Sequence, residues 1–303
     1  MNRLSVARRL KRDRVYLLLL APALIYYIMF RYVPMFGIAV SFMDYNLFKG
    51  VWASDWVGLK HYRTFIDNPD AWIIIRNTLL LGLYKFLFSF PAPIVLAILF
   101  HEMRWKKYRK FVQTVSYMPF FLSQVVISSI LIMLLSPSTG WINKVIQTMG
   151  FEPVLFLQKS EWFRTIFIAS DIWQTVGFGT IIFLAALTAI DPQLYEAAKM
   201  DGAGRWKQTL HVTLPGIVPA IVILFILQIG GILEVSFDKA FLLGNAANME
   251  TSDIISTYVY RIGILGGGFS YAAAIDLSMA IVSLLFIYTA NRVSRKVGET
   301  SLW

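Results

Sequence analysis

Long apolar stretches alternate with shorter polar segments along most of the chain. Six of them have about 20 or more largely apolar residues, enough to cross ~30 Å of hydrocarbon at ~1.5 Å per residue. The predicted spans are Tyr16–Phe42 (with a break near Pro34), Ile73–Phe100, Phe111–Leu135, Phe163–Ile190, Ile217–Val235 and Tyr271–Ala290. The pattern therefore predicts an all-α, polytopic membrane protein with six transmembrane helices.

The composition agrees with this prediction. Hydrophobic residues make up 57% of the 303 positions and charged residues only 15%, whereas a soluble domain carries about 25% charged residues. The chain has no cysteine, so it can form neither a disulfide nor a thiolate metal site, and its three histidines are scattered. No metal site is expected.

The distribution of Lys and Arg predicts the topology. Of the 28 basic residues, 17 fall in the N-terminal tail, in the loops after the second and fourth spans, and in the C-terminal tail, while seven fall in the opposite loops. Cytoplasmic segments carry the excess of Lys and Arg. We therefore expect cytoplasmic termini, with a basic tail at residues 1–15, a permease domain at residues 16–291 and a second tail at residues 292–303. The net charge of +10 is explained by topology, and nucleic acid is not expected as a partner.

The polar stretch at residues 191–219 has helix signals of its own. Asp191 can cap the first amides of a helix, and Pro192 suits its first position. Gly202 can end this helix, because glycine accepts a left-handed backbone. A second short helix is expected from about Arg205 to His211, ended by Leu214-Pro215. The basic loops place this stretch, a predicted coupling helix, on the cytoplasmic side.

This stretch resembles the EAA signature of importer-type ABC transporter permeases, the loop that docks on the ATPase subunit. The matching residues are Glu196, Ala197, Ala198, Asp201, Gly202, Ala203, Leu214, Pro215 and Pro219. Without the resemblance, caps, alanines and a glycine would also suit any polar loop between two spans. With it, the signature implies a type I ABC importer permease fold in which these residues couple the chain to an ATPase.

The resemblance extends along nearly the whole chain after the basic tail, to the LplB-type permeases of carbohydrate-uptake ABC importers. The similar segments are residues 21–46, 56–62, 76–81, 90–103 and 113–126, with Phe120 where many relatives have His. The family implies a multi-pass protein of the bacterial cytoplasmic (inner) membrane. It also implies a second homologous permease, two ATPase subunits that bind ATP and Mg, a solute-binding protein, and oligosaccharide substrates that include rhamnogalacturonan and alginate types.

Polar and aromatic residues inside the spans are candidates for the substrate pathway, because ionisable groups in a span usually face the bundle interior. They are Arg76, Lys85, Asp171, Trp173, Gln174, Phe178, Gln228, Glu234 and Asp276. Asp171, Gln174 and Phe178 recur at helical spacing and are predicted to share one face suited to a sugar. Arg76 and Lys85 could complement a uronide. The alternative is an ion pair that fixes packing, such as Lys85 with Asp171 or with Asp276.

No enzyme active site is expected. The chain has no phosphate-binding GxxxxGK[ST] pattern, no paired catalytic carboxylates and no Ser/His/Asp arrangement, so ATP hydrolysis would belong to a partner. The first alternative is a secondary transporter or channel driven by an ion gradient through Asp171, Lys85 or Asp276. A membrane anchor is disfavoured by the charges inside the spans.

Overall fold

The structure is a computed structural model that describes residues 13–297, with side chains to residue 292. Of the predicted tails at residues 1–15 and 292–303, residues 1–12 and 298–303 lie outside the described residues. The described chain is almost entirely helical and divides into two compact units. The first comprises residues up to 67 together with 261–277, and the second comprises residues 68–260 together with those from 278 onward.

The first unit contains the N-terminal helix and a small hairpin. Its elements are α2 (Arg14–Tyr27), the π-helical η1 (Ile28–Tyr32), the 3-10 helical η2 (Val33–Phe42), β1 (Met43–Asp44), β2 (Asp55–Trp56), α3 (Lys60–Ile66), most of the π-helical η6 (Tyr260–Leu265) and the start of α16 (Phe269–Val297). The strands β1 and β2 pair antiparallel, with Met43 opposite Trp56. The first span is continuous from Arg14 to Phe42, and its helix type changes next to Pro34 where a break was predicted.

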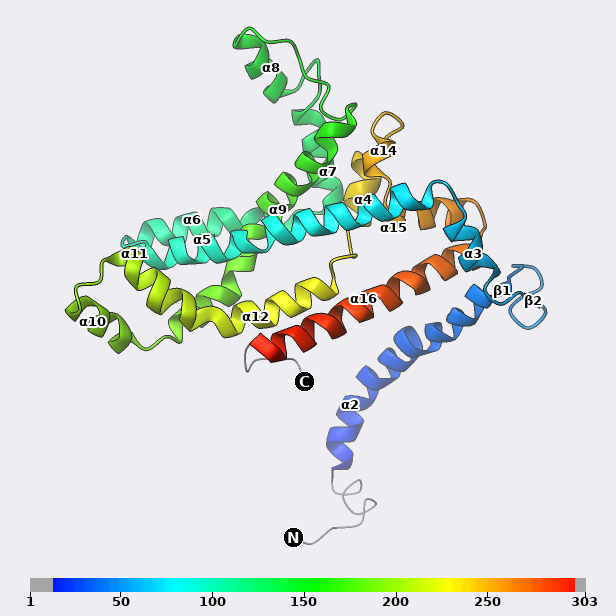
Figure 1. Cartoon of the computed structure of the whole chain (residues 1–303), viewed down its shortest axis with the longest axis horizontal. Helices are drawn as coiled ribbons and strands as arrows, with labels where there is room; N and C mark the ends of the chain where they lie inside the picture. The colour runs from blue at the N-terminus through cyan, green and yellow to red at the C-terminus, as the bar shows by residue number, and fades with distance from the viewer. Residues whose placement is uncertain (1–12, 298–303) are drawn as a thin grey trace. The chain divides into compact units, whose positions relative to one another are not determined.

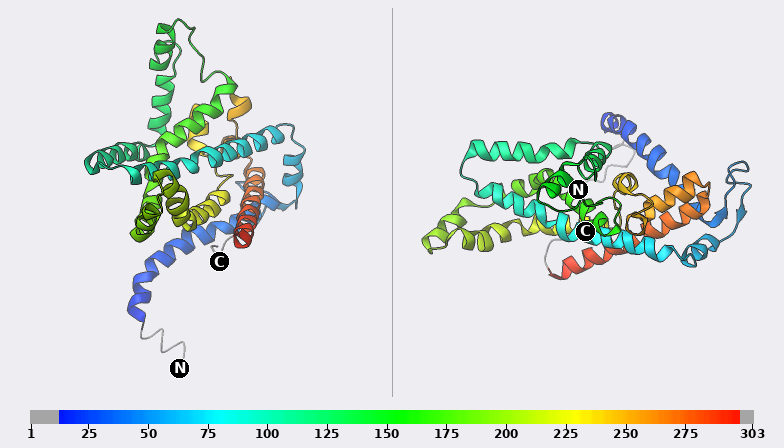
Figure 2. Two further views of the ribbon diagram at one scale, coloured as in Figure 1. Left: turned by 60° about the vertical axis from the view of Figure 1, so that its left-hand side comes forward. Right: turned by 90° about the horizontal axis from the view of Figure 1, so that it is seen from above.

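The second unit holds the remaining elements and most of α16 (Figures 1 and 2). They are α4 (Ala71–Tyr84), η3 (Lys85–Ser89), α5 (Pro91–Glu102), α6 (Lys106–Tyr117), η4 (Met118–Phe121), α7 (Gln124–Leu134), α8 (Trp141–Thr148), α9 (Ser160–Thr188), α10 (Pro192–Met200), α11 (Arg205–Gln208), η5 (Thr209–Thr213), α12 (Leu214–Gly230), α13 (Phe237–Leu243), α14 (Met249–Ser252) and α15 (Ile255–Val259). The long helix α9 packs against α5, α6 and α12.

Within residues 13–297, five helices are long and apolar enough to cross a membrane, or six if one bent pair is counted as a span. The predicted span at residues 111–135 corresponds to this bent pair, in which the helix from Lys106 to Phe121 meets α7 at 101°. Pro119 lacks an amide hydrogen. Leu122 and Ser123 are extended, and the Ser123 hydroxyl accepts a hydrogen bond from the amide of Val126. A new helix therefore starts at Gln124.

The fifth span also differs from its prediction. Leu214-Pro215 does not end the helix that begins at Arg205, because the chain stays helical from Arg205 to Gly230. The π-helical turns of η5 directly precede Pro215, and such wider turns accommodate a residue that cannot donate a backbone hydrogen bond. The helix then ends at Gly230, short of the predicted Val235.

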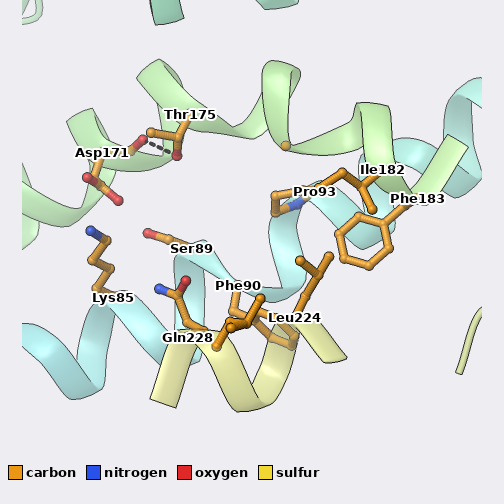
Figure 3. A pocket seen from close by; sticks show the side chains of 12 residues that line it. Lys85, Ser89, Phe90, Pro93, Asp171, Thr175, Ile182, Phe183, Leu224 and Gln228 are labelled. Carbon is orange, nitrogen blue, oxygen red and sulfur yellow. Dashed lines mark hydrogen bonds between the residues drawn. The ribbon is translucent and has the colours of Figure 1, made fainter. Parts of the chain in front are cut away.

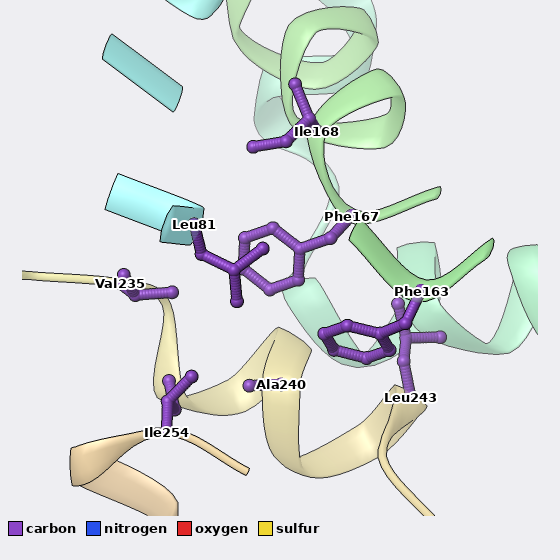
Figure 4. Packing of buried hydrophobic residues seen from close by; sticks show 8 residues of the cluster. All are labelled: Leu81, Phe163, Phe167, Ile168, Val235, Ala240, Leu243 and Ile254. Carbon is purple, nitrogen blue, oxygen red and sulfur yellow. The ribbon is translucent and has the colours of Figure 1, made fainter. Parts of the chain in front are cut away.

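Two apolar clusters form the core of the second unit. The first contains Leu81, Phe163, Phe167, Ile168, Val235, Ala240, Leu243 and Ile254 (Figure 4). The second joins α5, α9 and α12 through Ala97, Phe183 and Ile217. These buried contacts hold α9 as the central element, so residues on its faces lie against several other helices.

Candidate functional site

A cavity of about 380 Å³ lies in the second unit between η3, α5, α9 and α12. Its walls are mostly apolar and include Phe90, Pro93, Ile182, Phe183, Leu224 and Leu227 (Figure 3). The polar side chains in the lining are Lys85, Ser89, Asp171, Thr175 and Gln228. Three of the predicted pathway residues, on three different helical segments, therefore meet at one cavity.

The polar lining residues differ in whether their side chains have hydrogen-bond partners. The Thr175 hydroxyl donates to the backbone carbonyl of Asp171 at 2.8 Å. The Ser89 side chain is buried, and its hydroxyl has no hydrogen-bond partner among the described residues. Lys85 is half-buried, and its side chain points toward the Asp171 carboxylate in Figure 3. The cavity thus presents unsatisfied hydrogen-bonding groups within an apolar wall.

Asp171 forms an ion pair with Lys239, whereas the packing pairs considered from the sequence were Lys85 with Asp171 and Lys85 with Asp276. The Lys239 Nζ lies 3.6 Å from Oδ1 of Asp171, and neither side chain is appreciably exposed. Burial lowers the pKa of Lys239 from its usual value, and the Asp171 carboxylate opposes this by favouring the charged form. Asp276 belongs to the other compact unit.

Gln174 and Phe178 lie on α9 with Asp171 but do not line the cavity, so the predicted common sugar-binding face is not formed there. The Gln174 side chain is buried and accepts a hydrogen bond from the Gln124 amide at 3.0 Å. The Phe178 ring stacks on Phe120, with the ring centroids 3.9 Å apart and the planes at 2°. These contacts brace α9 against the bend between α6 and α7.

The other predicted pathway residues also lie outside this cavity. Arg76 is half-buried on α4, and its Nε has no hydrogen-bond partner among the described residues. Trp173 is about half exposed, with 47% of its surface accessible. Glu234 comes after the end of α12, so it is not inside a helical span as predicted. Arg76 and Lys85 are thus not brought together as a pair of cations at the cavity.

Sequence reasoning missed Lys239 and gave no role to Phe120. Lys239 is one of the seven basic residues counted in the opposite loops, but it lies on the buried face of α13 and its exposed fraction is 0%. Its signal in the sequence is FDKAFLL, where Asp238 and Lys239 are the only charged residues in an otherwise apolar segment. Phe120, the departure from the expected His, is explained by the ring that stacks on Phe178.

The predicted helix at residues 191–201 is present as α10, and its caps are those expected. The Asp191 carboxylate accepts a hydrogen bond from the amide of Gln193 at 2.9 Å, and Pro192 is the first helical residue. Gly202 has a φ of 76°, a left-handed conformation that side chains with a Cβ rarely adopt. Of the signature residues, Glu196, Ala197, Asp201 and Gly202 are exposed, whereas Ala198 and Ala203 are half-buried.

Side-chain contacts hold the α10–α11 segment against the neighbouring helices. The Tyr195 hydroxyl lies 3.1 Å from the hydroxyl of Thr213, which is buried. Nη1 of Arg205 lies 3.9 Å from Oε2 of Glu102 at the end of α5. Figure 1 shows α10 at the end of the unit where α5 ends and α11 begins. The signature residues are thus exposed on a segment tied to α5 and to the helix that continues into α12.

The apolar side chains of Leu194, Met200 and Trp206 are also exposed beside the signature residues. Their exposed fractions are 53%, 88% and 74%. Exposed apolar side chains grouped around a polar helix are typical of a surface that binds another protein. The segment therefore has the composition of a docking surface.

The helical membrane fold and this exposed signature define an integral membrane component of a transport system. Residues 89–298 match the family model of the binding-protein-dependent transport system inner membrane component, and the chain belongs to this family. The predicted family is thereby confirmed.

Within the described residues, no group of three or more His, Asp or Glu side chains could hold a metal ion.

Similar proteins cover nearly the whole chain. The polygalacturonan/rhamnogalacturonan transport system permease protein YteP of Bacillus subtilis is 45% identical over 97% of this chain and 92% of its own length. Protein LplB of the same organism is 42% identical over the same shares. In the crystal structure of a bacterial alginate ABC transporter in complex with an alginate pentasaccharide-bound periplasmic protein, one chain is 39% identical. It matches with a TM-score of 0.91 over 98% of this chain and 99% of that chain.

Proposed function

We propose that this chain is the permease subunit of an ABC importer that carries oligosaccharides derived from polysaccharides across the cytoplasmic membrane. The observation that carries the proposal is the EAA signature, of which Glu196, Ala197, Asp201 and Gly202 are exposed on α10 and on the turn that follows it. Full-length similarity to permeases named for polygalacturonan/rhamnogalacturonan and to a chain of an alginate transporter supports the substrate class.

In the proposed topology both termini and the α10–α11 segment are cytoplasmic. The excess of Lys and Arg in the two tails and in the loops after the second and fourth spans supports this orientation. The permease domain comprises residues 16–291, the coupling segment residues 191–219, and the tails residues 1–15 and 292–303. The protein acts in a bacterial inner or sole membrane.

The α10 helix is the proposed docking site of a separate ATPase subunit that binds ATP and Mg. Ala197 and Ala198 have short side chains, which let a partner approach the helix backbone, and Glu196 offers a charge beside them. When the ATPase dimer closes, α10 moves as a lever. The contact of Tyr195 on α10 with Thr213 in η5 and that of Arg205 on α11 with Glu102 on α5 transmit this movement to the helices that line the cavity. The chain itself does not hydrolyse ATP.

A second, homologous permease subunit completes the translocation pathway, and a solute-binding protein delivers the oligosaccharide from outside. The lining of the cavity, with apolar and aromatic walls and a few polar groups, suits a sugar, since hydroxyls take the hydrogen bonds and rings contact the C–H faces. Lys85 and Gln228 are its proposed polar contacts. Alginate is described as an acidic polysaccharide in a related transporter structure, and we propose that the substrate here is acidic too.

Co-purification tests the proposal. The detergent-solubilised wild-type chain is expected to bring down an ABC ATPase and a second permease, identified by mass spectrometry. Gly202→Asp, which places a Cβ and a charge at a left-handed position, and Glu196→Lys are expected to lose the ATPase and keep the permease. Glu152→Lys changes an exposed carboxylate in another loop and serves as the matched control. Absence of any ATPase from the wild-type preparation under mild conditions would refute the coupling role of α10.

A further inference from the structure

Three charged side chains lie at or beside the cavity, and their charges do not sum to zero. Lys85 and Asp171 line it, and Lys239 lies behind Asp171. We propose that Lys239 sets the charge of the cavity: by neutralising Asp171 it leaves the Lys85 ammonium free to bind a carboxylate of the substrate. This inference rests on the proposed function and specifies how the pathway selects an acidic oligosaccharide.

The first step is that Asp171 already has a cationic partner. Lys239 and Asp171 have exposed fractions of 0% and 4%, and 3.6 Å separates the Nζ from Oδ1. A buried carboxylate is costly unless it is paired, because little solvent remains to stabilise its charge. The Phe167 ring lies 5.3 Å from the same ammonium and adds a cation–π contact. The negative charge of Asp171 is therefore compensated from behind the cavity wall.

The second step is that Lys85 points toward the Asp171 carboxylate but forms no ion pair with it. Among the residues that the structure describes, none forms an ion pair with Lys85 within 4.0 Å. Lys85 is only half-buried, and it enters the cavity from the π-helical turn η3, opposite α9 (Figure 3). The three charges sum to one positive charge, which belongs to the side chain that a ligand in the cavity can reach.

The third step is that the surroundings suit a carboxylate. The walls are mostly apolar, so an ionic contact inside the cavity is screened less than it would be in water. The buried Ser89 hydroxyl lacks a partner among the described residues and lies one helical turn beyond Lys85 on the lining. An ammonium and a hydroxyl donor together match the two oxygens of a carboxylate. The amide of Gln228 remains for sugar hydroxyls.

The buried pair also predicts how the cavity responds when Lys239 loses its charge. In Lys239→Met, Asp171 is left without its partner, and Lys85 is the cation available to replace it. The cavity then has no net charge and no free ammonium. Neutralising Asp171 in the same chain by Asp171→Asn restores a free Lys85. The preference for an acidic substrate should be lost in the single variant Lys239→Met and recovered in the double variant. This pattern distinguishes charge compensation from a simple requirement for Lys239.

The experiment compares uptake of a short oligogalacturonide with uptake of its carboxyl-reduced, neutral counterpart by the complete importer in proteoliposomes. The same binding protein is used throughout, so its own preference cancels when variants are compared as ratios. Wild type is expected to prefer the acidic probe. Lys85→Met and Lys239→Met should each reduce this preference by about tenfold, equivalent to about 1.4 kcal/mol, and Asp171→Asn/Lys239→Met should restore most of it. Lys144→Met, an exposed lysine on α8, is the matched control.

Two results would overturn the inference: a preference that Lys85→Met leaves unchanged, or a double variant that is no better than Lys239→Met. If Lys239→Met fails to assemble, the comparison of Lys85→Met with the Lys144→Met control decides the matter, because Lys85 is not part of the buried pair. Uptake of neither probe by an assembled wild-type complex would instead contradict the proposed function. Equal uptake of both probes by wild type would contradict this inference and the proposed acidic substrate, and it would leave the importer role standing.

Discussion

Asp171 and Lys239 show how single residues determine the chemistry of this protein. Their ion pair joins α9 to α13, two helices that are far apart in the sequence, and it lies directly behind the cavity wall. The sequence marks Asp171 as costly inside an apolar span, but it does not show that Lys239 is the charge it meets. Pairing depends on how α13 folds back against α9, and no local pattern specifies that contact.

Removing one member of this buried pair is expected to destabilise the protein by about 3 kcal/mol, since the remaining charge is left without compensation. Thermal unfolding of the purified chain in detergent should show lower midpoints for Lys239→Met and for Asp171→Asn. The double variant should unfold closer to wild type than either single variant. Additive losses in the double variant would mean that the two side chains stabilise the fold independently of each other.

At the scale of elements, local sequence signals predicted the ends of the short helix α10 correctly. They did not predict where the long helices bend or continue. Asp191, Pro192 and Gly202 specify α10 through capping and a left-handed turn, which depend on neighbours in sequence, and the structure has each of them. The 101° bend before Gln124 was not predicted, because a proline in an apolar run can end, kink or leave a helix continuous. Pro215 was expected to end a helix and is accommodated by η5.

The close approach of α6 to α9 gives a prediction at this scale. A Cβ added at Gly177 would meet the backbone of Ser116, which cannot move as a flexible side chain can. Gly177→Ala should therefore destabilise the protein by about 1–3 kcal/mol, the range typical of overpacking. Gly37→Ala is the control, because no atom lies within 4 Å of the Cβ position at Gly37. Equal unfolding midpoints for the two variants would contradict the tight α6–α9 contact.

At the scale of the whole molecule, apolar length and the EAA signature predicted the class of protein. The family match and the five or six candidate spans agree with that prediction. The cavity was predicted only in part. Lys85, Asp171 and Gln228 line it, but Arg76, Gln174 and Phe178 do not. Helical spacing shows which residues share a face of one helix, whereas the neighbours of that face depend on packing between helices.

The proposed orientation can be tested because the chain has no cysteine of its own. Lys144→Cys on α8 and Lys199→Cys on α10 introduce one thiol each at exposed positions. In intact cells, a membrane-impermeant maleimide should label the thiol at position 144. It should label the thiol at position 199 only after the membrane is permeabilised. The reverse pattern would place α10 outside, where no ATPase could reach it.

The central claim is that a partner ATPase acting through α10 drives transport, and the energy source tests it most directly. The complete importer in proteoliposomes should take up a radiolabelled oligogalacturonide when ATP is supplied to the side that carries α10. This uptake should continue after ionophores collapse all ion gradients, and it should stop with a non-hydrolysable ATP analogue. Uptake that needs no ATP and depends on a proton or sodium gradient would contradict the account and identify the chain as an ion-driven transporter.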